Sequence, residues 1–174
     1  RGVWIWHDED YADSINGTPR YFRYTFNLSD APTEGNIQIT ADDNMRMWIN
    51  GVEIKNEMFQ QTWRNIPLIE DIQDYMTAGE NVIAVSVKND TLYAGLLFDG
   101  YVKTEQGQWV DLISSDTTVT SLVEYEGWYE KEYDDSAWGQ AQIVEKVGGV
   151  QWGDDAIFDA SAIVQNVFEV KEYS

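Results

Sequence analysis

Alternation between apolar and polar residues is the clearest pattern in the first two thirds of the chain. Between Tyr21 and Leu28, every second residue is a large hydrophobe and the residues between them are polar. Ile37, Ile39 and Ala41 continue the same two-residue period. This period places alternate side chains on opposite faces of a strand. Both stretches are therefore predicted to be strands with one face in a core.

Further strands are predicted from turn signals and β-branched residues. The stretch Met45 to Ile54 has the pattern of a hairpin with Asn50-Gly51 at its turn, since these two residues accept the positive φ angles of a type I′ turn. Other predicted strands are 81–88, 96–103, 109–114 and, near the end, 162–170. Only the stretch 68–76 looks helical, and it needs no more than one turn at the surface.

This order of elements predicts an all-β protein, a β-sandwich of the jelly-roll type with one or two short helical turns. We expect residues 1–153 to form the sandwich. Residues 154–174 are expected to be a strand or tail that either completes the sandwich or pairs with a partner. The chain starts at Arg1 without methionine or a signal peptide, so a processed or excised fragment is expected.

The charge balance narrows the range of partners. The chain has 31 acidic and 11 basic residues and a net charge of −20. Such a surface repels nucleic-acid phosphates and anionic lipids, and the absence of a long apolar run argues against membrane insertion. It attracts hard divalent cations, although a purely solubilising acidic surface explains the charge equally well. With no cysteine, thiolate metal sites and thiol nucleophiles are excluded.

Three oxygen-bearing side chains follow one predicted strand and precede another: Asp42, Asp43 and Asn44. At a strand end neighbouring carboxylates are able to converge, and a hard cation would relieve their mutual repulsion. A simple Asx-turn, in which these side chains bond nearby amides, is the competing interpretation. Asn89 and the loop around Tyr93 follow a later strand, where an amide oxygen and a carbonyl would complete a calcium shell or simply belong to an ordinary loop.

Aromatic residues have core and surface roles that the sequence does not separate. Trp63 and Tyr93 lie in polar, loop-like contexts and are candidates for stacking on a sugar. Trp48 faces away from its neighbours, either into a second layer or onto the surface, whereas Trp4 and Trp6 are expected to share one face of the first strand.

The sequence disfavours catalysis. His7 is the only histidine, no G-x-S-x-G motif is present, and Asp42 and Asp43 have no evident partner carboxylate. The chain is therefore expected to be non-catalytic.

Five segments, in order, resemble a known family. They are 4–6 (WIW), 19–26 (PRYFRYTF), 40–51 (TADDN through WING), 79–96 (GENVIAV, then Asn89 and AGL) and 127–138 (GW, then YDDSAW). Together they resemble the galactose-binding-like jelly rolls attached to bacterial α-L-rhamnosidases. The last segment is also similar to the sugar-binding domains of family 2 glycosidases.

The resemblance implies a calcium-dependent, rhamnose-binding site. Carried over by position, Asp42, Asp43 and Asn89 would supply metal oxygens, with a loop carbonyl near Tyr93, and the sugar would approach the same ion. The double aspartate also resembles the calcium loop of lectin-like domains related to anthrax protective antigen. Family members carry Asp-Asn where this chain carries Asp42-Asp43, a change that keeps the ligand atom type and bears on rhamnose selectivity.

These observations predict a calcium-dependent module that binds a glycan or polysaccharide in a secreted or cell-surface multidomain protein, a class that includes larger glycoside hydrolases. The predicted sugar contacts are Asp42, Asp43, Asn44, Trp63 and Tyr93. The competing hypothesis is a structural module of an adhesin, surface layer or extracellular filament that self-associates through the strand at 162–170.

Overall fold

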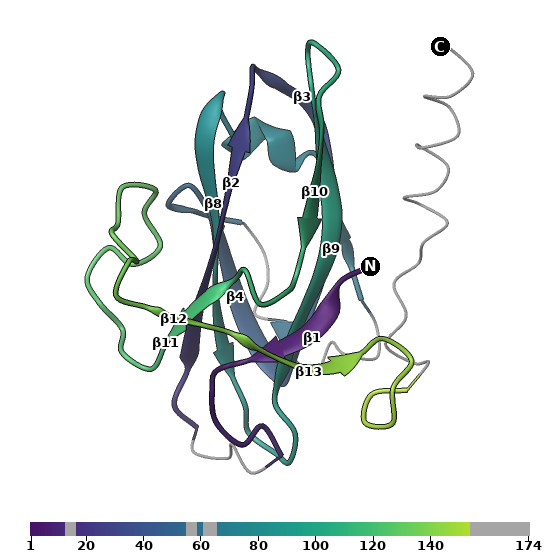
Figure 1. The fold of residues 1–174 in the computed structure, drawn as a ribbon, viewed down its shortest axis with the longest axis vertical. Coiled ribbons are helices and arrows are strands. Elements are labelled where there is room, and N and C mark those ends of the chain that lie inside the picture. The colour runs from purple at the N-terminus through teal and green to yellow at the C-terminus, as the bar shows by residue number, and fades with distance from the viewer. Residues whose placement is uncertain (13–16, 55–58, 61–65, 154–174) are drawn as a thin grey trace.

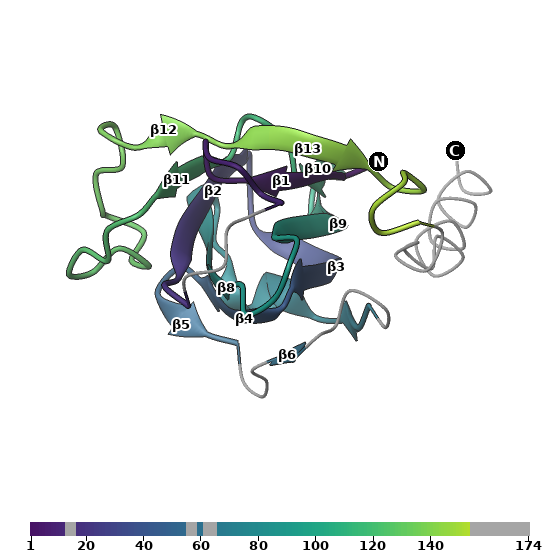
Figure 2. The ribbon, with the colours of Figure 1, turned by 90° about the horizontal axis from the view of Figure 1, so that it is seen from below.

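The computed structural model describes residues 1–12, 17–54, 59–60 and 66–153. In this part of the chain thirteen strands form two antiparallel sheets that pack face to face (Figure 1). Seen end-on, the two sheets enclose a common interior (Figure 2). The predicted all-β jelly-roll sandwich is confirmed.

One sheet contains six of the described strands. Its order is β13-β1-β9-β3-β7, and β10 also pairs with β9. The longest contact in it joins β3 and β9 along almost their full lengths. Its strands are β1 (Val3–Trp6), β3 (Pro32–Asp42), β7 (Leu68–Ile69), β9 (Gly95–Thr104), β10 (Trp109–Ile113) and β13 (Gln142–Lys146).

The other sheet contains seven of the described strands. Its order is β12-β11-β2-β8-β4-β5, and β6 also pairs with β4. Strand β8 lies at its centre between β2 and β4. Its strands are β2 (Arg20–Leu28), β4 (Asn44–Ile49), β5 (Val52–Glu53), β6 (Phe59–Gln60), β8 (Gly79–Lys88), β11 (Val119–Ser121) and β12 (Gly139–Gln140).

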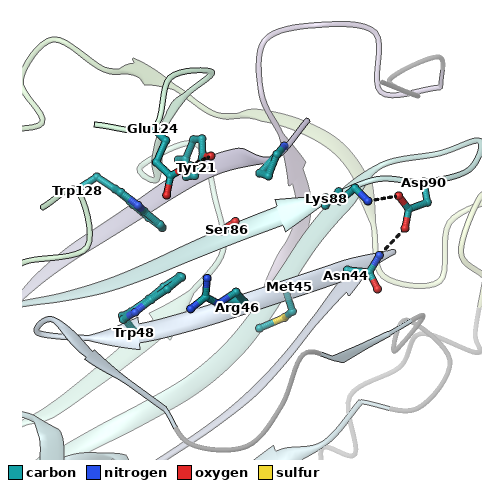
Figure 3. A pocket seen from close by; sticks show the side chains of 11 residues that line it. Tyr21, Asn44, Met45, Arg46, Trp48, Ser86, Lys88, Asp90, Glu124 and Trp128 are labelled. Carbon is teal, nitrogen blue, oxygen red and sulfur yellow. Dashed lines mark hydrogen bonds and ion pairs between the residues drawn. The ribbon is translucent and has the colours of Figure 1, made fainter. Parts of the chain in front are cut away.

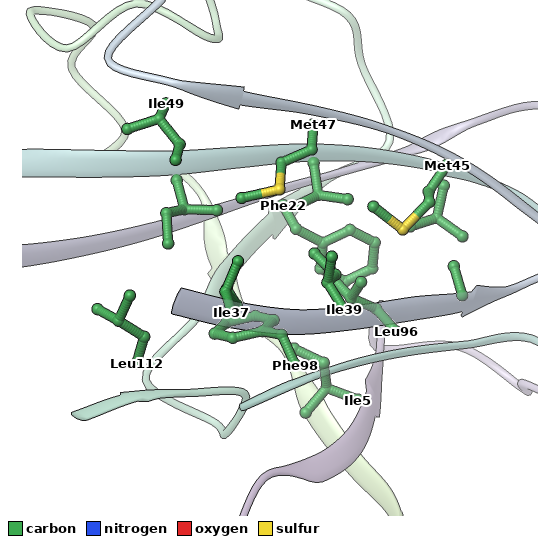
Figure 4. Packing of buried hydrophobic residues seen from close by; sticks show 14 of the residues in the cluster. Ile5, Phe22, Ile37, Ile39, Met45, Met47, Ile49, Leu96, Phe98 and Leu112 are labelled. Carbon is green, nitrogen blue, oxygen red and sulfur yellow. The ribbon is translucent and has the colours of Figure 1, made fainter. Parts of the chain in front are cut away.

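The core lies between the sheets and is built from the alternating residues. Phe22 and Phe26 of β2 and Ile37 and Ile39 of β3 belong to one buried cluster. Figure 4 shows Met45, Met47 and Ile49 of β4 on the opposite side of this cluster from Phe98 and Leu112. The predicted period-two strands therefore face the core as expected.

One further local prediction is confirmed and another is partly right. Asn50 and Gly51 have φ angles of 48° and 83° and connect β4 to β5, as the predicted hairpin requires. The stretch 68–76 begins with the two residues of β7, and its only helical element is the 3₁₀ turn η2 (Ile72–Tyr75). The prediction of a surface turn is only partly right, because Ile72 is fully buried.

The prediction that Trp4 and Trp6 share one face is wrong. The register of β1 against β13 shifts between Trp4 and Ile5. A bulge of this kind breaks the alternation of side chains. As a result, Trp6 joins the main core, whereas Trp4 packs in a separate cluster with Leu97 and Trp152.

The segment between β11 and β12 forms a second layer over the outer face of the seven-stranded sheet. Trp48 and Trp128 pack edge-to-face there with ring centroids 5.1 Å apart. Of the two positions predicted for Trp48, the structure shows the second layer. The segment also covers Arg23, whose guanidinium bonds to the Asp135 carboxylate and to the backbone oxygens of Trp128, Glu130 and Tyr133.

Candidate functional site

Asp42 and Asp43 lie where the chain passes from one sheet to the other. Asp42 is the last residue of β3, and β4 begins at Asn44 in the opposite sheet. The peptide bond between the two aspartates is cis. Both residues are buried, with exposed fractions of 7% and 3%. Two adjacent carboxylates are therefore held at one end of the sandwich with little contact with water.

The Asp42 carboxylate is held by an indole from the end of the described chain. Trp152 Nε1 donates a hydrogen bond of 2.9 Å to Asp42 Oδ2. The Trp152 ring stacks on Trp4 at 4.2 Å between centroids. Gly95, which pairs with Asp42 across β3 and β9, makes this possible, because a Cβ atom there would lie 2.7 Å from the Trp4 ring and about 3 Å from the Trp152 ring.

Burial changes the acidity of Asp42. The pKa of its carboxyl is raised from 3.8 to about 7, and loss of hydration is the largest cause. The hydrogen bond from Trp152 acts in the opposite direction, and the neighbouring Asp43 adds to the increase. The negative form of Asp42 is thus poorly compensated by the protein itself. Perturbed acids of this kind gather at functional sites.

Asp43 anchors the loop that follows β8. Its Oδ2 accepts hydrogen bonds from the backbone amides of Asp90 (2.7 Å) and Thr91 (2.9 Å). In return, the Asp43 amide donates to the carbonyl of Lys88 at 3.3 Å. These partners are 45 or more residues away, so this is not the local Asx-turn considered above. The two polar segments singled out in the sequence meet at this carboxylate.

Asn89 and Tyr93 belong to the anchored loop. Asn89 is buried, and its Nδ2 donates to the Leu92 carbonyl at 3.3 Å. Tyr93 is half-buried, and its ring lies 6.1 Å from that of Tyr11. The Tyr11 ring lies in turn 6.1 Å from that of Trp152, the partner of Asp42. Tyr93 therefore belongs to an aromatic group beside the aspartate pair.

The remaining two predicted sugar contacts are placed differently. Asn44 starts β4 and donates to Asp90 Oδ2 at 2.6 Å, on the outer face of the seven-stranded sheet. Trp63 lies outside the described residues. The structure thus brings together Asp42, Asp43, Asn89 and Tyr93, and sets Asn44 at their border.

The donor atoms at this site suit a hard cation. In the described ranges no group of three or more His, Cys, Asp and Glu side chains is placed to hold a metal ion. Two adjacent carboxylates remain, and Asn89 belongs to the loop that Asp43 anchors. Carboxylate and amide oxygens are hard ligands that calcium accepts. Because the structure places no histidine in the group, a transition-metal site is a poorer fit.

Sequence reasoning missed two parts of the site. Trp152 is 110 residues from Asp42, and its neighbours in the sequence carry no motif that points to a carboxylate partner. The amides of Asp90 and Thr91 are backbone groups, which any residue would supply. The signals for that loop were the polarity of the stretch 88–95, its place after a predicted strand and the family resemblance at Asn89.

The described strands form a two-sheet β-sandwich with a buried aspartate pair at one end. No protein-family model matches the chain. An α-L-rhamnosidase of Streptomyces avermitilis is 30% identical over 155 residues, which cover 86% of this chain. The chain spans only 15% of the length of that relative.

Solved structures give the same picture. The crystal structure of the Streptomyces avermitilis α-L-rhamnosidase complexed with L-rhamnose matches 87% of this chain and 15% of its own, with 28% identity and a TM-score of 0.76. A Pleurotus ostreatus lectin in complex with GalNAc matches 90% of this chain and 45% of its own, with 19% identity and a TM-score of 0.76. A native α-L-rhamnosidase from Aspergillus terreus matches 84% of this chain and 21% of its own, with 17% identity and a TM-score of 0.72.

These matches confirm the resemblance expected from the sequence. The chain corresponds to one small part of the rhamnosidase chains and has the fold of their accessory domains. The lectin and the Aspergillus terreus enzyme, at under 25% identity, share the fold alone. In the described part of the chain, no helix has the length and hydrophobicity needed to span a bilayer.

Proposed function

We propose that the chain is a non-catalytic carbohydrate-binding module whose sugar site is at the Asp42–Asp43 end of the sandwich and depends on calcium. One observation carries the proposal: Asp43 binds the amides of Asp90 and Thr91, which draws the second polar loop against the aspartate pair. A relative complexed with L-rhamnose and a lectin complexed with GalNAc, both with this fold, support a sugar as the ligand.

The proposed ligand set uses atoms from both segments. One oxygen of each carboxylate accepts protein hydrogen bonds, and we assign the other to the ion. Asn89 and a carbonyl near Tyr93 would add amide and backbone oxygens. Bound calcium supplies a positive charge that compensates the buried carboxylates and offers coordination positions to vicinal sugar hydroxyls. Tyr93, together with Trp63, is proposed to contact the apolar face of the sugar.

The absence of catalysis is part of the proposal. Glycosidases place two carboxylates about 5 to 9.5 Å apart on either side of the glycosidic bond that they cleave. Asp42 and Asp43 are instead adjacent, buried and hydrogen-bonded to the protein. The His7 imidazole bonds to the Thr120 hydroxyl, and burial lowers its pKa. We therefore assign a catalytic role neither to the aspartate pair, which lacks the spacing of glycosidase carboxylates, nor to His7.

We further propose that the module acts outside the cell within a larger protein. Its match to a small part of much longer rhamnosidases is what supports neighbouring domains. A module of this kind would raise the local concentration of glycan at a linked domain without chemistry of its own.

Isothermal titration with L-rhamnose and N-acetylgalactosamine tests the proposal, using calcium-loaded and EDTA-treated protein. We expect binding of at least one sugar with calcium and a loss of ten-fold or more in affinity with EDTA or in Asp42→Asn. Asp116→Asn removes one exposed carboxylate elsewhere and is the matched control. Binding unaffected by EDTA and by Asp42→Asn contradicts the calcium-dependent site. No binding, with self-association in size-exclusion chromatography, favours the structural module.

A further inference from the structure

A hollow lies on the outer face of the seven-stranded sheet. Its volume is about 330 Å³, near the lower end of the range of about 300–1,000 Å³ for small-molecule sites. Its floor is Ser86 on β8, which pairs with Arg46 of β4 on one side and with Tyr21 of β2 on the other. Serine is much smaller than both neighbours, so the surface is recessed at this position. We call this hollow the Ser86 cleft.

One end of the Ser86 cleft is aromatic and fixed. Trp128 packs over Ala84, the next outward-facing residue of β8, together with Tyr21 and Trp48. The Trp48 and Trp128 side chains are held edge-to-face, and the residues are only 6% and 2% exposed. The second layer therefore ends beside Ser86 with a rigid apolar wall.

The other end of the cleft is polar. Lys88 Nζ lies 2.9 Å from Asp90 Oδ1, and Asn44 donates to the other oxygen of the same carboxylate. Figure 3 shows these three side chains at the opposite end of the cleft from Trp48 and Trp128, with Ser86 and Arg46 between the two ends.

The charges around the cleft are balanced. Arg46 and Lys88 are its cations, and Asp90 and Glu124 are its carboxylates. Glu124 accepts the Tyr21 hydroxyl at 3.1 Å, and the Arg46 guanidinium lies over the Trp48 ring while pairing with Glu53. Such a lining offers donors and acceptors side by side, which matches sugar hydroxyls because each both donates and accepts.

We propose that the Ser86 cleft is a second carbohydrate site that takes one neutral, hydroxyl-rich sugar residue. A pyranose has apolar C–H edges for the tryptophan end and hydroxyls for the charged end. The balanced lining offers an anionic sugar no net attraction, and the chain's net charge of −20 repels it. This site goes beyond the proposed function, because it uses neither the Asp42–Asp43 pair nor a metal ion.

The two sites share the loop after β8. The Asp90 amide is bound by Asp43, while the Asp90 carboxylate lines the cleft. Substitution of Asp43 would therefore disturb both sites, and Asp42→Asn is the suitable variant for separating them.

Nuclear magnetic resonance of the ¹⁵N-labelled full chain in EDTA tests the second site. The neutral probes are L-rhamnose, D-galactose and N-acetylgalactosamine, and D-glucuronate is the anionic probe. We expect at least one neutral probe to shift the backbone amides of Ser86 and Arg46 and the indole N–H of Trp48 or Trp128. Glucuronate is expected to leave them unchanged. No shift there with any neutral probe, or an equal shift with glucuronate, overturns the proposal.

Variants assign the binding to the cleft. Ser86→Leu fills the floor of the cleft and is expected to weaken sugar binding at least ten-fold. Arg46→Ala removes an exposed residue from its wall and is also expected to weaken sugar binding. Glu53→Gln breaks the Arg46 ion pair but does not line the cleft, so it should retain binding. Should Ser86→Leu fail to fold, Arg46→Ala decides alone.

Normal binding by Arg46→Ala and by folded Ser86→Leu contradicts the second site. Asp42→Asn should retain the shifts at the cleft. Absence of calcium-dependent sugar binding in the parent chain, with these shifts intact, would refute the proposed function alone.

Discussion

Two buried charged side chains in this molecule have very different surroundings. Arg23 lies beneath the outer layer with a carboxylate and three backbone oxygens around its guanidinium. Asp42 lies at the sheet junction with one indole N–H donor and a second carboxylate beside it. A fully partnered buried charge stabilises the fold, whereas an incompletely compensated one is a candidate for contact with a ligand.

The largest loss of stability is expected when the fully partnered charge of Arg23 is removed. Arg23→Met leaves the Asp135 carboxylate and three carbonyls without their donor, so we expect a loss of about 3–5 kcal/mol in the free energy of unfolding. Urea denaturation followed by tryptophan fluorescence measures it. Arg46→Met, on the same sheet face but exposed, should cost no more than about 1 kcal/mol. Equal losses in the two variants would contradict a special role for the Arg23 contacts.

Removal of the Asp42 charge should stabilise the folded protein at high pH, whereas removal of the Arg23 charge destabilises it. The pKa of Asp42 rises from 3.8 in the unfolded reference to about 7 in the folded protein. Folded Asp42 therefore keeps a proton that the unfolded chain loses, and stability should fall as pH increases from about 4 to about 7. Asp42→Asn removes this dependence and should be more stable than the parent at pH 8 in EDTA, by about 2–4 kcal/mol. Parallel stability curves for the two proteins between pH 5 and 8 would contradict the pKa shift.

The loop anchor should have an intermediate effect. Asp43→Ala removes the acceptor of the Asp90 and Thr91 amides, at an expected cost of about 1–3 kcal/mol. Hydrogen exchange at these two amides should accelerate more than elsewhere in the sheet. Asn44→Ala removes one more exposed hydrogen bond to the same loop and is expected to cost less than about 1 kcal/mol. Unchanged protection in Asp43→Ala would show that the loop is held by other contacts.

The smallest effect concerns the single donor to Asp42. Trp152→Phe keeps a ring against Trp4 but removes the indole N–H. In the parent chain the hydrogen bond from this N–H lowers the pKa of Asp42. We expect the carboxyl pKa to increase further and the stability at pH 8 to decrease by about 1 kcal/mol. A ¹³C NMR titration of the aspartate side chains reads the pKa directly. A decrease in the pKa would contradict the assigned hydrogen bond.

Most of the fold was predictable because its determinants are local. The alternation in β2 and the Asn50-Gly51 turn each depend on a few adjacent residues. The bulge between Trp4 and Ile5 was not predictable, since it arises from pairing with β13, about 140 residues later. The local pattern also could not decide whether Trp48 lies in a second layer or on the surface, because the segment that covers it, 122–138, is distant in the sequence.

The site was predictable in its polar residues but not in their partners. Asp42, Asp43 and Asn89 were singled out by residue type and by their place after strands. The Trp152 bond and the Ser86 cleft depend on segments brought together by the tertiary fold. The roles of Trp63 and of the strand at 162–170 remain predictions, because both lie outside the described residues.

Direct titration of calcium into chelator-treated protein is the decisive measurement for the aspartate pair. Isothermal calorimetry of the parent chain, Asp42→Asn and the charge-matched Asp116→Asn at pH 8 separates a specific site from general attraction to an acidic surface. We expect one saturable site in the parent chain and in Asp116→Asn, and its loss in Asp42→Asn. No saturable binding in the parent chain, or equal binding in Asp42→Asn, would contradict it.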